Sequence, residues 1–186
     1  MTTIRALTVR FRMGLAPVRA RAILAAGVVA LAGVCVVAPG CDQQASRSVG
    51  SVKLGGKWFH LEISADNATR VKGLSGREFI EPDGGMLFAF PRPSTQQFVM
   101  RDCPIPIDII FLDGSGRITA MHAMVPEEPR REGESDGDYE ERLKRYPSRF
   151  AAQFAIELAG GTLPSLGLKD GDQVDLDVAA LKAMAK

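Results

Sequence analysis

The sequence contains few of the residues that most often carry out catalysis or bind metals. Its 186 residues include two histidines, three cysteines and one tryptophan. Cys35 lies inside an apolar run near the N-terminus and Cys41 follows that run, so Cys103 is the only cysteine in the remainder of the chain. One thiol cannot form an internal disulfide. We therefore expect the folded part to be held together by its hydrophobic core alone.

Short motifs for phosphate binding, hydrolase nucleophiles and dithiol redox chemistry are also missing, because no P-loop, Gly-x-Ser-x-Gly or Cys-x-x-Cys pattern occurs. The Met121-His122-Ala123-Met124 segment, with Cys103 and His60 elsewhere, has side chains that suit a soft metal such as copper. In a strand, however, Met121 and His122 would point to opposite faces. We therefore expect neither a metal nor another cofactor. Cys103 also has no evident histidine partner to activate it as a nucleophile.

Acidic residues are absent from the first 40 residues, which carry five arginines. The other 18 basic side chains and all 22 acidic ones lie in residues 41–186, which gives this part of the chain a net charge of −4. A domain that binds nucleic acid would need a basic face. The charge balance therefore argues against a nucleic-acid partner.

Residues 22–38 contain no charged or polar side chain and follow a basic segment. This is the layout of a secretory signal, and the run is shorter than the about 20 apolar residues of a typical membrane-spanning helix. The next residues, Pro39-Gly40-Cys41, resemble a bacterial lipobox, which implies that Cys41 becomes the acylated first residue of the mature protein. An uncleaved anchor helix and simple secretion are the alternatives. Acylation, an uncleaved anchor and secretion would all place the domain outside the cytoplasm. Acylation of Cys41 would tether it to a membrane of the bacterial cell envelope, on the periplasmic side.

The remaining sequence predicts a single β-rich domain. We divide the chain into a leader (1–40), a polar tether (41–50), the domain (51–178) and a weakly helical tail (179–186). Apolar residues alternate with polar ones in 57–64, whereas 107–112 is apolar except at Asp108. About eight short strands between Gly- and Pro-containing turns, with one or two short helices, predict a compact β-barrel-like domain or a rolled antiparallel sheet.

Residues 126–148 interrupt the strand pattern. This stretch contains eight acidic side chains interleaved with five basic ones and almost no apolar residue. We interpret it as a solvated surface insertion with one or two helical turns near residues 139–146. A partner-binding element is the alternative.

Several separated blocks resemble the family called domain of unknown function family 192, over roughly residues 51–178. They are Gly73-Leu74 with Arg77, Gly85 to Phe90, Phe98-Val99-Met100, Pro106 to Phe111, Asp113, Gly116, Glu157, Gly161 and Gly171-Asp172. The resemblance implies a compact, mostly β, barrel-like domain that often follows a signal or lipoprotein leader and has no settled activity. The chain departs from the family's usual residues at Val99 and at 101–103, where any ligand specificity is expected.

Asp108 is a lone acid among isoleucines, and a buried carboxylate needs a cation, several donors or a proton. A structural role would pair it with Arg77 or Arg101, or would have it cap the loop made by residues 104–106. A functional role would place Asp108, Glu157 and Arg77 around one cleft. Two carboxylates and a guanidinium could then bind a polar ligand or carry out acid–base chemistry.

We therefore expect a membrane-tethered envelope domain that binds a small polar ligand or a partner protein. The candidate ligand-binding residues are Arg77, Arg101, Asp108 and Glu157, and no catalytic residue is assigned. One alternative is an envelope hydrolase that uses Asp108 and Glu157 as its acids. Another is a purely structural or interaction module. The absence of an evident nucleophile, metal set or cofactor loop favours a role other than catalysis.

Overall fold

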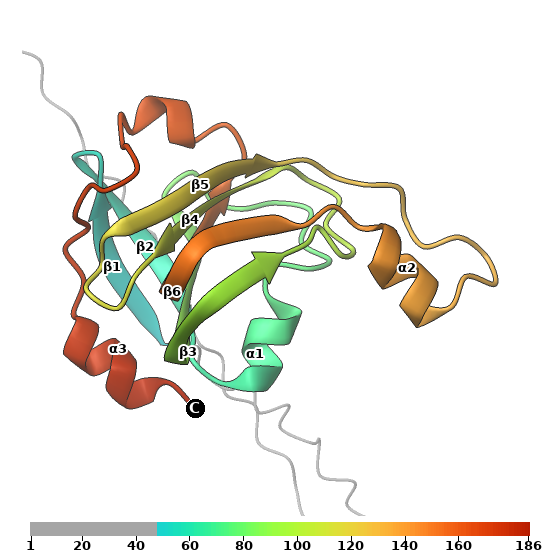
Figure 1. The fold of residues 1–186 in the computed structure, drawn as a ribbon. Helices are drawn as coiled ribbons and strands as arrows, with labels where there is room; N and C mark the ends of the chain where they lie inside the picture. Colours follow the sequence, from blue (N-terminus) through green and yellow to red (C-terminus); the bar gives the residue numbers. More distant parts are fainter. Residues whose placement is uncertain (1–47) are drawn as a thin grey trace, which may run out of the picture. The chain divides into compact units, whose positions relative to one another are not determined.

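One rolled sheet of six strands organises residues 48–186, the part of the chain that the computed structural model describes (Figure 1). The strands are β1 (Val49–Leu54), β2 (Lys57–Ser64), β3 (Gly84–Phe98), β4 (Ile107–Leu112), β5 (Ile118–Met124) and β6 (Tyr146–Ala159). The helices are α1 (Asn67–Lys72), α2 (Asp136–Arg142), α3 (Val178–Met184) and the 3-10 helix η1 (Leu163–Ser165). The strand order is β1-β2-β3-β6-β4-β5. The mainly β prediction is thus confirmed.

The first elements form where local sequence signals predict them. β1 and β2 make an antiparallel hairpin, and Gly55 and Gly56 turn the chain with φ of 52° and 84°. Two consecutive residues of positive φ are what a tight hairpin turn requires. The side chain of Asp66 accepts a hydrogen bond from the N–H of Thr69 at 3.0 Å and so caps α1. The Gly55-Gly56 pair and Asp66 thus account for where the hairpin turns and where α1 begins.

The sheet is mixed and open, which corrects part of the expected architecture. β2 and β3 run parallel, because the chain crosses over through α1 between them, whereas the other neighbouring strands are antiparallel. A parallel pair needs such a crossover connection. β1 and β5 are the two edges, so the sheet rolls without closing into a barrel. Within residues 48–186 the structure has six strands, whereas the sequence predicts about eight.

The missing strands are explained by β3 and by the segment before α3. The sequence predicts separate strands on either side of Pro91 and Pro93, but β3 is continuous over 15 residues. Its register with β6 shifts between Ala89 and Ser94, and prolines are tolerated at such irregularities. The strand predicted at 173–178 is reduced to a single bridge between Gln173 and Arg117.

The central strands are buried on both faces, which separates two hydrophobic clusters. The first core includes Leu61, Leu87, Ile110, Phe154, Ile156, Leu158 and Leu181 of α3. The second core, on the other face, includes Met86, Phe88, Met100, Ile109, Phe111 and Tyr146. All six residues of β4 are buried. Residues 86–90 are all apolar, which is typical of a strand buried on both faces, and the first four of them are buried.

The acidic insertion carries α2, which lies beyond the ends of β5 and β6 in Figure 1. The helix begins at Asp136, slightly before the predicted turn, and Ser135 caps it by accepting from the N–H of Asp138. Most of the insertion is exposed, as expected, but Tyr139 and Leu143 are buried. The insertion is therefore anchored to the domain.

The predicted leader and Cys41 lie outside the described residues, as does most of the tether. Within residues 48–186, no helix has both the length and the apolar character needed to cross a lipid bilayer.

Asp108 of β4 has a structural partner that the sequence did not identify. Its side chain is 1% exposed and faces the first core. Oδ2 accepts a hydrogen bond of 2.7 Å from the backbone N–H of Leu163, the first residue of η1. The expected partners, Arg77, Arg101 and the loop at 104–106, are not the ones it uses. Asp108 thus ties η1 to the centre of the sheet.

We expect Asp108→Ala to lower the free energy of unfolding by about 1–3 kcal/mol, because the partly buried N–H of Leu163 loses its hydrogen-bond acceptor. Asp108→Asn should cost less, because an amide oxygen can still accept this bond. The measurement is urea denaturation of each variant. Asp175→Asn, at an exposed position, is the matched control and should change stability little. Equal stability of Asp108→Ala and wild type would refute the structural role.

Candidate functional site

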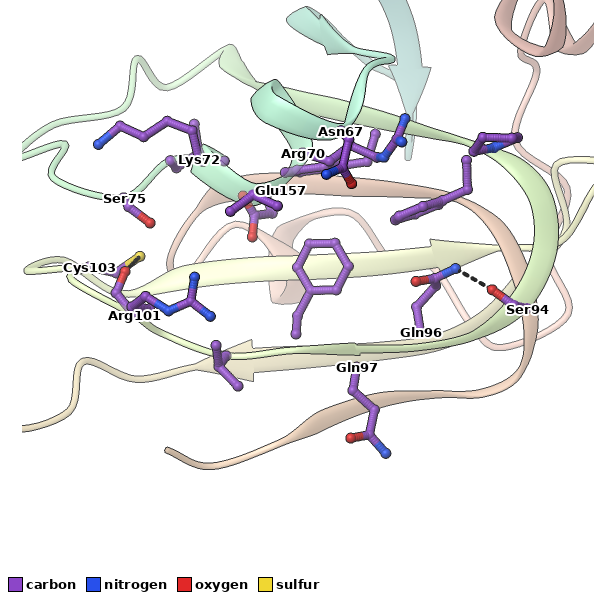
Figure 2. A pocket seen from close by; sticks show the side chains of 18 of the residues that line it. Asn67, Arg70, Lys72, Ser75, Ser94, Gln96, Gln97, Arg101, Cys103 and Glu157 are labelled. Carbon is purple, nitrogen blue, oxygen red and sulfur yellow. Dashed lines mark hydrogen bonds between the residues drawn. The ribbon is translucent and has the colours of Figure 1, made fainter. Parts of the chain in front are cut away.

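A pocket of about 620 Å³ is lined mainly by α1 and the bent strand β3, together with the loop after α1 and the loop after β3. Figure 2 shows β3 curving around the pocket, with the side chains of Asn67, Gln96 and Arg101 on different sides of it. β6 contributes one residue, Glu157. A concave site of this size, with aromatic walls and a few polar groups, is typical of small-molecule binding.

Glu157 is fixed in the middle of the sheet. It lies opposite Met86 of β3 on one side and opposite Ile109 of β4 on the other. Strand alternation directs its side chain to the face of the second core, whereas its neighbour Leu158 joins the first core. The side chain is 5% exposed, and Oε2 is buried with no hydrogen-bond partner among the described residues. Leaving such an atom unpaired costs about 1–3 kcal/mol.

Burial also changes the proton affinity of this acid. It raises the pKa of Glu157 to about 8, and the positive charge of Arg77 opposes the rise only in part. At neutral pH the carboxyl group therefore holds its proton. A protonated carboxyl group both donates and accepts hydrogen bonds. Glu157 can therefore contact a neutral polar group inside the pocket.

Phenylalanine rings form an apolar wall. Phe98 meets Phe88 edge to face, with ring centres 5.1 Å apart, and meets Phe90 in the same way at 6.4 Å. Phe98 also contacts Phe111 at 5.4 Å. Edge-to-face packing of this kind fixes the rings. All but Phe111 line the pocket and present an ordered surface to the apolar part of a ligand.

Lys72, Ser75, Arg101 and Cys103 occupy one end of the pocket (Figure 2). The Sγ of Cys103 donates to the carbonyl oxygen of Arg101 at 3.4 Å. Burial raises the pKa of Cys103 to about 11, and the negative charge of an ionised Glu157 adds to the rise. The thiol therefore stays protonated at neutral pH, which makes it a poor nucleophile.

The acidic insertion holds Arg101 in place. Nε and Nη2 of Arg101 donate to Oε2 of Glu140 in α2, at 2.8 and 2.5 Å. Glu140 also accepts from Nη1 of Arg145 at 3.1 Å. One carboxylate therefore serves two guanidinium groups.

Tyr139, which is 4% exposed, makes a second connection between the insertion and the pocket loop. Its hydroxyl donates to Oδ1 of Asp102 at 3.2 Å. The guanidinium groups of Arg142 and Arg130 lie 4.8 and 5.4 Å from its ring centre. Asp102 has a φ of 52°, which is unusual for a residue other than glycine. These contacts support the loop between the two pocket residues at 101 and 103.

The four predicted binding residues separate into two groups. Arg101 and Glu157 line the pocket, but Arg77 is paired with Glu62 at 2.6 Å and does not line it. Asp108 lies opposite Leu158, on the other face of the sheet from Glu157. The hypothesis of one cleft holding Arg77, Asp108 and Glu157 is therefore wrong. The hydrolase alternative needs Asp108 and Glu157 at one site, and the sheet places them on opposite faces.

Lys72, Ser75 and Phe98 also line the pocket, although the sequence does not predict them as site residues. Lys72 and Ser75 come from the end of a short helix and its following turn, and nothing in their local pattern shows that a distant strand bends toward them. One signal did identify the region. The chain departs from the usual residues of the family that it resembles at Val99, Arg101 and Cys103. All three of these residues line the pocket.

Both histidines have ordinary hydrogen-bond partners. Nε2 of His122 lies 2.7 Å from the carbonyl oxygen of Pro147, and Nδ1 of His60 lies 3.1 Å from Oγ of Ser51. Among residues 48–186, no three side chains of His, Cys, Asp or Glu gather in a way that could hold a metal ion.

Two solved structures resemble the chain. A protein of unknown function from Novosphingobium aromaticivorans DSM 12444 is 25% identical, with a TM-score of 0.60, over 76% of this chain and 94% of that one. A protein from Sinorhizobium meliloti 1021, described as a candidate transcription regulator, is 26% identical, with a TM-score of 0.57, over 71% of this chain and 96% of that one. No curated protein matches the chain significantly.

A family model supplies the assignment that these structures leave open. The model for DUF192, described as an uncharacterized ACR, matches residues 50–176. The match covers all the residues that line the pocket, including Glu157. It also covers all six strands apart from Val49, the first residue of β1. The chain therefore belongs to the DUF192 family.

Proposed function

We propose that this domain is a binding protein that holds a small ligand in the pocket beside Glu157. The observation that carries the proposal is the buried Oε2 of Glu157, which has no partner within the described part of the chain. Buried polar atoms are nearly always hydrogen-bonded, and exceptions are concentrated at functional sites. A ligand that offers a hydrogen bond to this oxygen would remove the cost of leaving it unpaired.

The lining of the pocket supports binding over catalysis. The nearest thiol, Cys103, is protonated at neutral pH, and the second buried acid of the sheet, Asp108, faces away. Glu157 therefore lacks the second reacting group that hydrolysis by a pair of acids requires. The phenylalanine wall and the polar side chains of Asn67 and Gln96 suit a ligand with both an apolar and a polar part.

We also propose that the domain works at the membrane of the cell envelope, tethered through an acylated Cys41. The lipobox-like segment at 39–41 supports this location, as does the basic and apolar leader before it. A short tether would keep the pocket close to the membrane surface, where it would meet ligands of the envelope.

The raised pKa of Glu157 predicts a pH-dependent stability. The folded state binds this proton up to pH about 8, whereas an unfolded glutamate releases it near 4.5. The stabilisation is therefore complete below pH 4.5 and is lost as pH rises toward 8. Relative to Glu157→Gln, the wild type should lose roughly 3–5 kcal/mol of unfolding free energy across this interval. Urea denaturation at several pH values measures the difference, and parallel curves would contradict the prediction.

The binding proposal predicts that a small molecule stabilises the full chain. Thermal-shift screening against sugars, nucleotides, amino acids and organic acids should find a class that raises Tm by several degrees, because ligand at 100 times Kd adds about 2.7 kcal/mol. Glu157→Leu should raise Tm in the absence of ligand, because it removes an unpaired polar atom, and should abolish the shift caused by ligand. A flat screen would reject the proposal in favour of a protein partner.

Acylation of Cys41 predicts a change of location on mutation. Cys41→Ser should move the protein from the membrane fraction to the soluble envelope fraction and prevent incorporation of a labelled fatty acid. Cys35→Ser is the matched control, because it removes a thiol from the apolar run and should leave both properties unchanged. Retention of the label in Cys41→Ser would show that another residue or an uncleaved helix makes the anchor.

A further inference from the structure

The pocket has an excess of positive charge. The cationic residues that line it are Arg70, Lys72, Arg92 and Arg101. Glu157 is the one acid among its lining residues, and it is protonated at neutral pH. The lining therefore favours a negatively charged occupant.

Arg70 is committed to the fold. Its guanidinium donates to the carbonyl oxygens of Ala65, Ala89 and Lys186 at 2.7, 3.0 and 2.6 Å. It also lies 5.6 Å from the centre of the Phe90 ring. With these contacts made, Arg70 serves to hold α1 against the sheet and not to bind a ligand.

Arg101 keeps part of its hydrogen-bonding capacity. Nε and Nη2 donate to Glu140, and Nη1 donates no hydrogen bond within residues 48–186. Since Glu140 also pairs with Arg145, the three groups together carry a net charge of +1. Arg101 is also 38% exposed in its side chain, so an incoming group can reach it.

Lys72 lies at the same end of the pocket. Its positive charge acts on the thiol of Cys103, whose Sγ contacts the backbone of Arg101. Lys72 is exposed in the last turn of α1. Two cations from separate elements thus lie at the same end of the pocket as Cys103 and Ser75 (Figure 2), and Phe98 lines the same pocket. This pairing of cations with an aromatic wall suits a molecule that is charged at one end and apolar at the other.

We infer that the ligand is an organic anion whose carboxylate or phosphate contacts Arg101 and Lys72 and whose apolar body packs on Phe98 and Phe90. The inference rests on the proposed binding function and names its ligand class. Charge-assisted hydrogen bonds to a guanidinium are stronger than neutral ones. Protonation of Glu157 matters here, because an ionised carboxylate in the same pocket would repel the ligand.

The test compares probes of one shape and different charge. The full chain is titrated by calorimetry at pH 7 with 1-naphthylacetate, with its neutral analogue 1-naphthylacetamide and with 1-naphthyl phosphate. At least one anion should bind about tenfold more tightly than the amide, which is the effect of one charge-assisted contact. The relative affinities of the two anions identify the acidic group that the site prefers.

Two variants locate the charge effect. Arg101→Gln and Lys72→Gln should each weaken binding of the anion severalfold and leave binding of the amide unchanged. Lys72→Gln alters an exposed residue, so it remains informative if Arg101→Gln fails to fold. Arg117→Gln makes the same charge change outside the pocket and should have no effect.

The outcomes separate this inference from the function on which it rests. Equal affinity for amide and anions, or unchanged anion binding in both variants, would overturn the anionic ligand. Binding of neutral compounds from the screen without either naphthyl anion would also overturn it, and would leave the pocket as a binding site. Failure of every compound to bind would reject both.

Discussion

The burial of both faces of β6 constrains the rest of the domain. β6 lies between β3 and β4, and its side chains enter the first and second cores alternately. Gly85 makes the close approach of β3 possible, because a Cβ at this position would lie 2.2 Å from the carbonyl oxygen of Glu157. With strands fixed on both sides, Glu157 cannot turn toward solvent. The sheet thus holds an acid at the edge of a pocket and keeps most of it from water.

The bend of β3 converts this buried acid into part of a site. The first half of the strand belongs to the sheet core, and the second half curves around the space above Glu157. The register shifts after Ala89 and Thr95 mark where the strand leaves regular pairing. The prolines at 91 and 93 suit the bend because they give up hydrogen bonds that the irregular ladder does not need.

Local signals in the sequence were sufficient for most elements and insufficient for their arrangement. Period-two alternation predicts β2 and a continuous apolar run predicts β4, and the structure has Asp66 and Gly73 as the caps of α1. The continuity of β3 and the parallel pairing of β2 with β3 depend on contacts between distant residues, which no local pattern encodes. Arg101 and Glu157, two of the four candidate binding residues, line the pocket, whereas Asp108 lies on the other face of the sheet. Which face a strand residue occupies depends on its register with neighbours, and a shift of one residue reverses the answer.

Arg101 belongs both to the pocket and to the contact with the acidic insertion, so the free energies of these two sets of contacts are linked. Its guanidinium holds Glu140 of α2 with two nitrogens and lines the pocket as well. Any molecule that changes the contacts of Arg101 from one side alters the free energy of the contacts on the other. Linkage of this kind is reciprocal, so the change that pocket occupancy makes to the docking of α2 equals the change that α2 makes to affinity in the pocket. A ligand held in the pocket would thus be coupled through one guanidinium to a surface helix on an acidic loop.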